Sequence, residues 1–226
     1  MRPVLVSLLA LFTLIRTPAV AQVCRGLAPP PSNQLQVTGS GTVASGLKSV
    51  GAAVAYGVSR AFGGVGLGST SVEALEKSAL DLGATLGYRI PVAASGRAEL
   101  CPTVRIGLQV GPNNAFESAV DRSTFSAVVG ATAGTSIVLG PQAALVPAVG
   151  LGLAYSRVKA DNQAGANLFR ISESYALAQL HIGIVLNQNI SVRPSVDLPL
   201  GQEGGDPTFG LTVGYNFGSR RASHSQ

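Results

Sequence analysis

Large and small residues alternate with a period of two along most of this chain, which is the periodicity of a β-strand and not of a helix. The clearest example is the segment 208–217, whose large face consists of Phe209, Leu211, Val213, Tyr215 and Phe217. Small or polar residues fill the other face, and the large face carries no charge. A barrel that crosses a lipid bilayer needs bulky apolar residues toward lipid and small or polar residues toward a narrow interior. The alternation therefore indicates the architecture of the protein and its location, and it says little about the biological function.

Eight alternating segments follow residue 48, at 50–60, 80–90, 100–110, 125–137, 145–156, 175–186, 190–200 and 208–217. They predict an all-β fold, an eight-stranded antiparallel up-and-down transmembrane β-barrel over residues 48–218. The connections are short at 92–97, 140–142 and 187–189, and longer at 61–77, 112–122, 159–172 and 202–207. Short periplasmic turns and longer extracellular loops are typical of outer-membrane barrels. An even number of strands places both ends of the chain on the periplasmic side.

The first 21 residues have the features of a secretory signal peptide. Arg2 supplies a positive start, residues 4–15 an apolar run, and Ala19-Val20-Ala21 a small-residue cleavage motif. We expect cleavage after Ala21, and the apolar run is too short to cross a membrane as a helix. Residues 22–47 are then expected to form a periplasmic N-terminal extension, and residues 219–226 a polar C-terminal tail.

Charge and composition exclude several classes of function. Loss of the signal peptide with its two arginines lowers the formal net charge from +5 to +3, which is too small to indicate nucleic-acid binding. Charged residues make up only 12% of the chain, against about a quarter in soluble domains. No stretch after the signal peptide is long enough for a transmembrane helix. A closed barrel is the other structure that satisfies its backbone inside lipid.

The strands of a secreted soluble barrel that binds a ligand inside also alternate between large and small residues. The two alternatives therefore differ in which of these faces points outward. A soluble exterior would carry Lys and Glu along each strand. Here the smaller face is Gly, Ala, Ser and Thr with isolated charges, which suits the narrow interior of a small barrel. We therefore favour the membrane barrel and keep the soluble barrel as an alternative.

The signal peptide, the eight segments and the final strand Thr208-Phe-Gly-Leu-Thr-Val-Gly-Tyr-Asn-Phe217 resemble the outer-membrane protein beta-barrel domain family, the small barrels of OmpA or OmpX type. The resemblance covers about 50–217. It implies a bacterial outer-membrane location, contact with outer-membrane lipid and with the barrel-assembly machinery, and a structural, adhesive or small-pore role.

Two further groups of residues bear on the fold. Cys24 and Cys101 are the only cysteines, and an even count in an exported chain favours a disulfide, with two unpaired thiols as the alternative. No metal-ligand spacing is present, and we expect no metal and no cofactor. Trp is absent, so the candidates for interfacial aromatic anchors are Tyr88, Tyr155, Tyr215 and Phe217.

Polar side chains on the small face would point into the lumen. They are Asp81, Arg89, Arg105, Gln109, Gln179, His181, Arg193 and Asp197. One hypothesis is a charged constriction that favours anions, in a narrow porin-like channel for small solutes. Because a narrow barrel tends to fill with side chains and buried arginine needs partners, we favour a structural interior network.

His181 invites an enzymatic hypothesis, that of a lipid-modifying barrel. Such catalysis needs a nucleophile and a base within hydrogen-bond reach. Ser195 or Asp197 could approach His181 across adjacent strands, but no motif supports a triad. We expect no catalytic residue. The sequence predicts a non-enzymatic barrel with a structural or loop-mediated binding role, whose extracellular ligand is unknown.

Overall fold

The computed structural model describes residues 24, 35–72, 77–92, 98–111, 120–162, 167–187, 189–201 and 205–217, and the regular structure in these ranges is β-sheet. No helix in the described ranges is long and apolar enough to cross a membrane. The strands are β1 (Leu35–Ala44), β2 (Leu47–Val58), β3 (Ala61–Val72), β4 (Lys77–Tyr88), β5 (Ile90–Pro91), β6 (Ala98–Val110), β7 (Val120–Thr135), β8 (Ile137–Gly140), β9 (Ala143–Asn162), β10 (Asn167–Leu186), β11 (Ile190–Leu200) and β12 (Thr208–Phe217).

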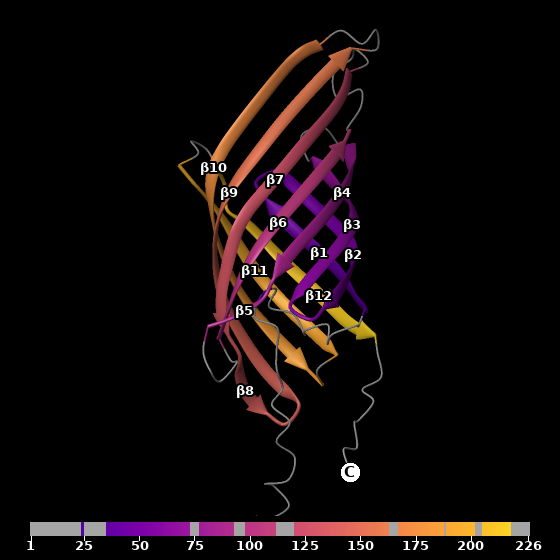
Figure 1. The fold of residues 1–226 in the computed structure, drawn as a ribbon. Helices are drawn as coiled ribbons and strands as arrows, with labels where there is room; N and C mark the ends of the chain where they lie inside the picture. The colour runs from indigo at the N-terminus through magenta and orange to yellow at the C-terminus, as the bar shows by residue number, and fades with distance from the viewer. Residues whose placement is uncertain are drawn as a thin grey trace, which may run out of the picture.

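Ten of these strands close into one antiparallel ring (Figure 1). Each pairs with the next in the order β1, β2, β3, β4, β6, β7, β9, β10, β11 and β12, and β12 pairs back with β1, with Phe217 opposite Leu35. The short strands β5 and β8 follow β4 and β7 and pair with β6 and β9. The predicted all-β antiparallel barrel is confirmed, and the predicted number of eight strands is wrong.

Two strands were missed because glycine hides the alternation of residue size. β1 lies within the expected N-terminal extension 22–47, so the barrel already includes Leu35 and does not begin at residue 48. β3 lies within the expected loop 61–77, and four of its twelve residues are glycine. A glycine has no side chain with which to mark a face. Both strands join β2 through two-residue turns, with positive φ angles at Gly46 (68°) and Ser59 (54°).

The barrel has two different ends, which we call the terminal end, where β1 begins and β12 ends, and the loop end, opposite it. β9 and β10 are the longest strands, with 20 residues each. At the loop end β10 extends past β11, which pairs with it only from Ala176 on, while β7 stays paired with β9 as far as Asn162 (Figure 1). The expected loop 159–172 is therefore wrong over most of its length, because it is largely strand. Between Asn167 and Tyr175, β10 pairs with β9 alone among the described strands, so its residues there do not have to alternate in size.

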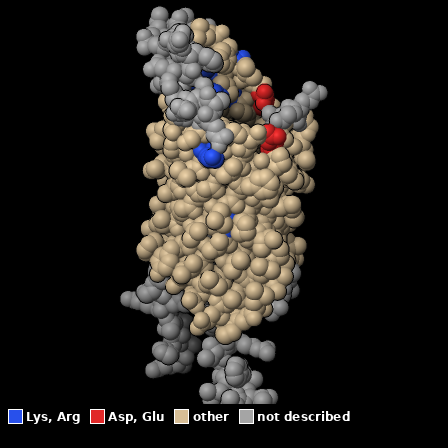
Figure 2. All heavy atoms as spheres, turned by 180° about the vertical axis from the view of Figure 1, so that it is seen from behind, with Lys and Arg blue, Asp and Glu red and all other residues tan. Residues whose placement is uncertain are grey.

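The large face of the alternation points outward, away from the lumen. Leu151 and Leu153 of β9 are 69% and 71% exposed, and large apolar side chains of the other ring strands are exposed in the same way. Figure 2 shows one side of the barrel, on which the visible charged side chains gather toward the upper end and the long wall below them is almost free of charge. The small face lines the lumen, where the buried residues of the strands lie.

Candidate functional site in the lumen

The predicted lumen residues come from two opposite parts of the ring. Asp81 belongs to β4, Arg105 and Gln109 to β6, Gln179 and His181 to β10, and Arg193 and Asp197 to β11; all lie on the less exposed, inward face of their strands. Arg89 is different. It lies in the break between β4 and β5 at the terminal end, where its guanidinium donates a hydrogen bond to the carbonyl oxygen of Ser59 in the β2–β3 turn.

The carboxylates of the lumen bind neutral donors. Asp81 accepts hydrogen bonds from the hydroxyl of Thr70 and, at 2.9 Å, from the amide nitrogen of Gln109. Asp197 accepts one at 3.0 Å from the amide nitrogen of Gln179. These bonds form one cluster on β3, β4 and β6 and a second on β10 and β11. Arg193 of β11 donates a further hydrogen bond, at 3.2 Å, to the hydroxyl of Thr212 on β12. The structural interior network stays a prediction.

The terminal half of the lumen is filled. Gln36 donates a 3.0 Å hydrogen bond to the side-chain oxygen of Asn216, and these two side chains are 0% and 2% exposed. Val146 and Val185 belong to an apolar cluster of buried residues on β9 and β10. Ser191 of β11 is also fully buried. Side chains from both walls therefore close this half of the barrel.

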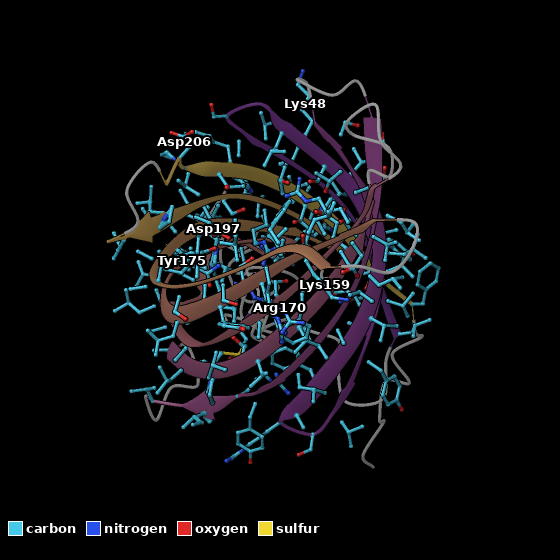
Figure 3. All side chains as sticks on the ribbon, turned by 90° about the horizontal axis from the view of Figure 1, so that it is seen from above. Lys48, Lys159, Arg170, Tyr175, Asp197 and Asp206 are labelled. Carbon is cyan, nitrogen blue, oxygen red and sulfur yellow. A yellow bond between two sulfur atoms is a disulfide. The ribbon has the colours of Figure 1, made fainter. Side chains whose placement is uncertain are left out.

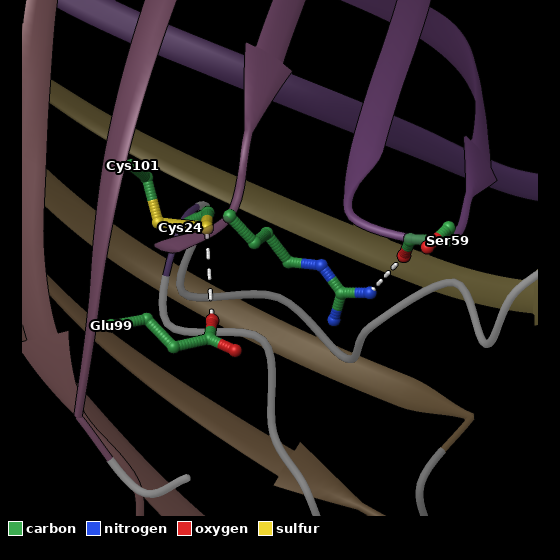
Figure 4. Close-up of a disulfide and its surroundings, with 5 residues drawn as sticks. Cys24, Ser59, Glu99 and Cys101 are labelled. Atoms are coloured by element: carbon green, nitrogen blue, oxygen red, sulfur yellow. Dashed lines mark hydrogen bonds between the residues drawn. A yellow bond between two sulfur atoms is a disulfide. The ribbon is translucent and has the colours of Figure 1, made fainter. Parts of the chain in front are cut away.

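A disulfide between Cys24 and Cys101 forms part of the same filling, with a Cα–Cα distance of 5.2 Å (Figure 4). Cys101 is on the inward face of β6, so the bond fixes Cys24, which belongs to no strand, inside the barrel. The two cysteines are 4% and 0% exposed and pack against the buried ring of Phe62. A Cβ atom on Gly87 would lie 2.2 Å from that ring, so the absence of a side chain at residue 87 makes room for it.

Glu99 lies next to the disulfide, with its carboxylate oxygen 3.7 Å from the Sγ atom of Cys24. Cys24, Glu99 and Cys101 place their potential metal-ligating atoms within 4.8 Å of one another. Because both sulfur atoms are used in the disulfide, neither thiolate that a soft metal ion would need is present in this state.

The loop half of the lumen is open. A vestibule of about 620 Å³ lies there, lined by residues that include Ser126, Tyr175 and Asp206. Figure 3, which looks down on this end, shows Tyr175 and Asp197 inside the ring. A smaller chamber of about 80 Å³ lies between His181, Arg193 and Cys24. Arg105 and Asp197 line both spaces and so stand at the boundary between them.

Outward-facing aromatic side chains lie near both ends of the barrel wall. Tyr88, Tyr215 and Phe217 are exposed near the terminal end, and the rings of Tyr215 and Phe217 meet edge to face with 4.8 Å between centroids. Tyr155 is exposed nearer the loop end, 6.5 Å from Phe125. Their role as interfacial anchors stays a prediction.

Sequence reasoning missed several residues that fill the lumen. Phe62 was assigned to a loop, although a single aromatic residue in a glycine-rich stretch is a signal for a side chain that enters a glycine-lined interior. Gln36 was assigned to the N-terminal extension. Val146 was placed on the small face with no role, and its size was the available signal that the lumen narrows there.

The comparisons with known proteins report structural similarity alone. No protein-family model and no curated protein sequence matches the chain. Among solved structures, it is similar to the N-terminal β-barrel domain of OprF from Pseudomonas aeruginosa (16% identity, 82% of this chain and 98% of that one, TM-score 0.35). It is also similar to Ail, the attachment invasion locus protein of Yersinia pestis, in complex with the heparin analogue sucrose octasulfate (14% identity, 83% of this chain and 100% of that one, TM-score 0.41). A third similar structure is an outer membrane channel from Pseudomonas putida F1 (15% identity, 84% of this chain and 97% of that one, TM-score 0.43).

Proposed function

We propose that this protein is a non-enzymatic, integral β-barrel of the bacterial outer membrane that does not conduct and whose loop end has a structural or ligand-binding role. The observation that carries the proposal is a barrel with an apolar outer wall and a lumen that is filled at one end and open at the other. Outer-membrane lipid and the barrel-assembly machinery are the partners that this role requires. The signal peptide and the tail 219–226 lie outside the described residues, and they remain part of the proposal.

The outer wall supports a membrane location over a secreted soluble barrel. Leu151 and Leu153 are among many large apolar side chains exposed around the ring. Soluble monomers rarely expose contiguous apolar patches larger than a few hundred Å². Lipid tails are the environment in which such a wall costs nothing to expose, and the closed ring leaves no unpaired strand edge in that environment.

The filled terminal half supports a closed lumen over the alternative, a narrow porin-like channel. Val146 and the hydrogen-bonded pair Gln36 and Asn216 are almost fully buried there. The disulfide also holds Cys24 inside this half of the barrel, because its partner Cys101 belongs to β6 of the wall. An ion that entered the vestibule would meet these side chains before it reached the terminal end.

The surroundings of His181 support the absence of catalysis. Ser195 is opposite His181 in the register of β10 and β11. Yet within the described ranges the imidazole makes no hydrogen bond to Ser195 or to a carboxylate, and its Nδ1 atom has no partner. A catalytic base needs a nucleophile and an orienting group in contact with it.

Two measurements test the proposal. Alkaline carbonate extraction of membranes from the expressing cells should leave the protein in the pellet, with a soluble periplasmic marker in the supernatant as control. The purified, oxidised protein in a planar lipid bilayer should give no sustained current steps, with a general porin as the positive control. Release by carbonate would contradict the membrane location, and reproducible steps would replace the closed lumen with the channel.

A further inference from the structure

The chamber between the vestibule and the disulfide is lined by one guanidinium, that of Arg105, and one buried ring nitrogen, Nδ1 of His181, for which the described residues supply no partner. Within the described part of the chain, the guanidinium of Arg105 makes no hydrogen bond and no ion pair. His181 is only 8% exposed, faces this chamber, and has no hydrogen-bond partner for its Nδ1 atom. Buried polar groups are usually hydrogen-bonded, so each exception requires an explanation.

The charge balance of the lining indicates the sign of a ligand. Arg105 and Arg193 line the chamber with a single carboxylate, that of Asp197. Arg193 is engaged elsewhere, since its guanidinium donates a 3.2 Å hydrogen bond to the hydroxyl of Thr212, so Arg105 is the group that can bind a ligand. The carboxylate of Asp197 already accepts the hydrogen bond from Gln179. Glu99, the other buried acid nearby, is in contact with the sulfur of Cys24 and does not line the chamber. The lining also contains the hydroxyl groups of Thr103, Thr132 and Ser195, which can donate to an anion.

We propose that this chamber binds a small inorganic oxyanion of the phosphate or sulfate class. Arg105 supplies the charge-assisted hydrogen bonds, as guanidinium groups commonly do for such anions. His181 donates from its ring on the opposite wall. The volume of about 80 Å³ exceeds the share of one water, roughly 30 Å³, and is far below the roughly 300 Å³ of a small organic-ligand pocket. It therefore suits a small ion better than an organic molecule.

The fold gives this site one route of entry. Arg105 and Asp197 line the vestibule as well as the chamber, and the vestibule opens at the loop end. On the opposite side lie the disulfide and the filled terminal half. The anion thus arrives from the side of the long β9–β10 hairpin and leaves the same way. The site is a closed-end binding site and goes beyond the proposed structural or loop-mediated role.

The test is direct binding to the purified, oxidised full chain in detergent free of phospholipid. Equilibrium dialysis against radiolabelled inorganic phosphate, and separately against labelled sulfate, at low ionic strength, should give saturable binding of about one ion per chain for at least one of the two. Arg105→Gln should weaken that binding about tenfold or more, since a hydrogen bond to a charged group contributes about 1.5–3 kcal/mol and about 1.4 kcal/mol is a factor of ten. The matched control is Arg170→Gln on β10, which removes the same charge from an exposed position, and it should leave the affinity unchanged.

Two further variants keep the proposal open to failure. His181→Gln retains a donor and should weaken binding less than Arg105→Gln. If Arg105→Gln does not fold, as judged by the mobility of the unheated protein in a denaturing gel, Arg105→Lys keeps the charge but loses the planar fork, and we expect it to bind several-fold more weakly than the native chain. Absence of saturable binding of either ion to the native protein would overturn the proposal. Equal losses in Arg105→Gln and Arg170→Gln would do the same, because they would reflect net charge and not the chamber.

Discussion

The two halves of the lumen use the same strands in opposite ways. In the terminal half, inward side chains such as Phe62 and Val146 belong to two apolar clusters and are almost completely buried. In the loop half, the inward positions of the same ring surround a vestibule of about 620 Å³. The difference shows that ten strands leave more interior space than inward side chains of average size fill. Where large residues point inward, the interior of the barrel is a packed core. Where small or polar residues point inward, the interior is a cavity.

If this comparison is correct, the largest loss of stability should follow removal of the disulfide in the filled half. The cross-link joins residues 77 apart in sequence, and the chain-entropy account assigns about 4–5 kcal/mol to a loop of that size. The double variant Cys24→Ser/Cys101→Ser should therefore unfold at clearly lower urea concentration. Because the chain has no Trp, unfolding is best followed by circular dichroism and by the gel mobility of unheated samples. An unchanged midpoint, with the native protein shown to be oxidised, would mean that the disulfide adds nothing to this half.

A smaller effect should separate two glycines on the same strand, Gly87 in the filled half and Gly83 farther toward the loop end. A Cβ on Gly87 would overlap the ring of Phe62, whereas one on Gly83 would be 3.6 Å from the nearest backbone oxygen. We expect Gly87→Ala to lower the free energy of unfolding by about 1–3 kcal/mol through overpacking. Gly83→Ala should change it by less than about 0.5 kcal/mol. Adding Phe62→Leu to Gly87→Ala should recover part of the loss, and equal losses from the two single variants would contradict the packing described for Phe62.

The smallest difference should distinguish two valines that face the lumen in different halves. Val146 is fully buried in the apolar cluster, and Val128 lines the vestibule. Val146→Ala should cost about 1–2 kcal/mol because it removes buried methyl groups and leaves a cavity. Val128→Ala enlarges a space that is already open, so its cost should be less than half as large. The measurement is the urea midpoint of unfolding of each variant. A lower midpoint for Val128→Ala than for Val146→Ala would refute the difference between the two halves.

The fold class could be predicted from sequence because the outward residues obey a strict rule. The outward positions of the ring strands are apolar, and residues such as Leu211 and Leu151 show this regardless of their neighbours along the chain. The number of strands could not be predicted in the same way. β1 and β3 satisfy the backbone geometry of a strand with Gly39, Gly41 and the glycines of 63–68, and those residues carry no size signal. β2 pairs with β1 on one side and with β3 on the other. This pairing is part of the tertiary structure, and the residue pattern of a single strand does not reveal it.

The candidate site was predictable as a set of residues but not as an arrangement. Alternation places Arg105, His181 and Arg193 on the inward face without knowledge of the register. Which of them lie near one another depends on the number of strands in the ring, and an eight-stranded ring would place them differently. Asp81 binds Gln109, while Arg105 has no hydrogen-bond partner among the residues that the structure describes. This difference follows from side-chain reach across neighbouring strands, which no pattern along a single strand specifies.

The pairing of β1 with β12 has a consequence for how the molecule is made. The first and last described strands are neighbours in space, so the ring stays open until β12 has been synthesised and paired with β1. A chain that stopped before Thr208 would present two unpaired edges, those of β1 and β11, each with a row of open backbone donors and acceptors. Closure of the barrel is thus a late step in the making of this molecule, because β12 supplies the partners that the free edges of both β1 and β11 need.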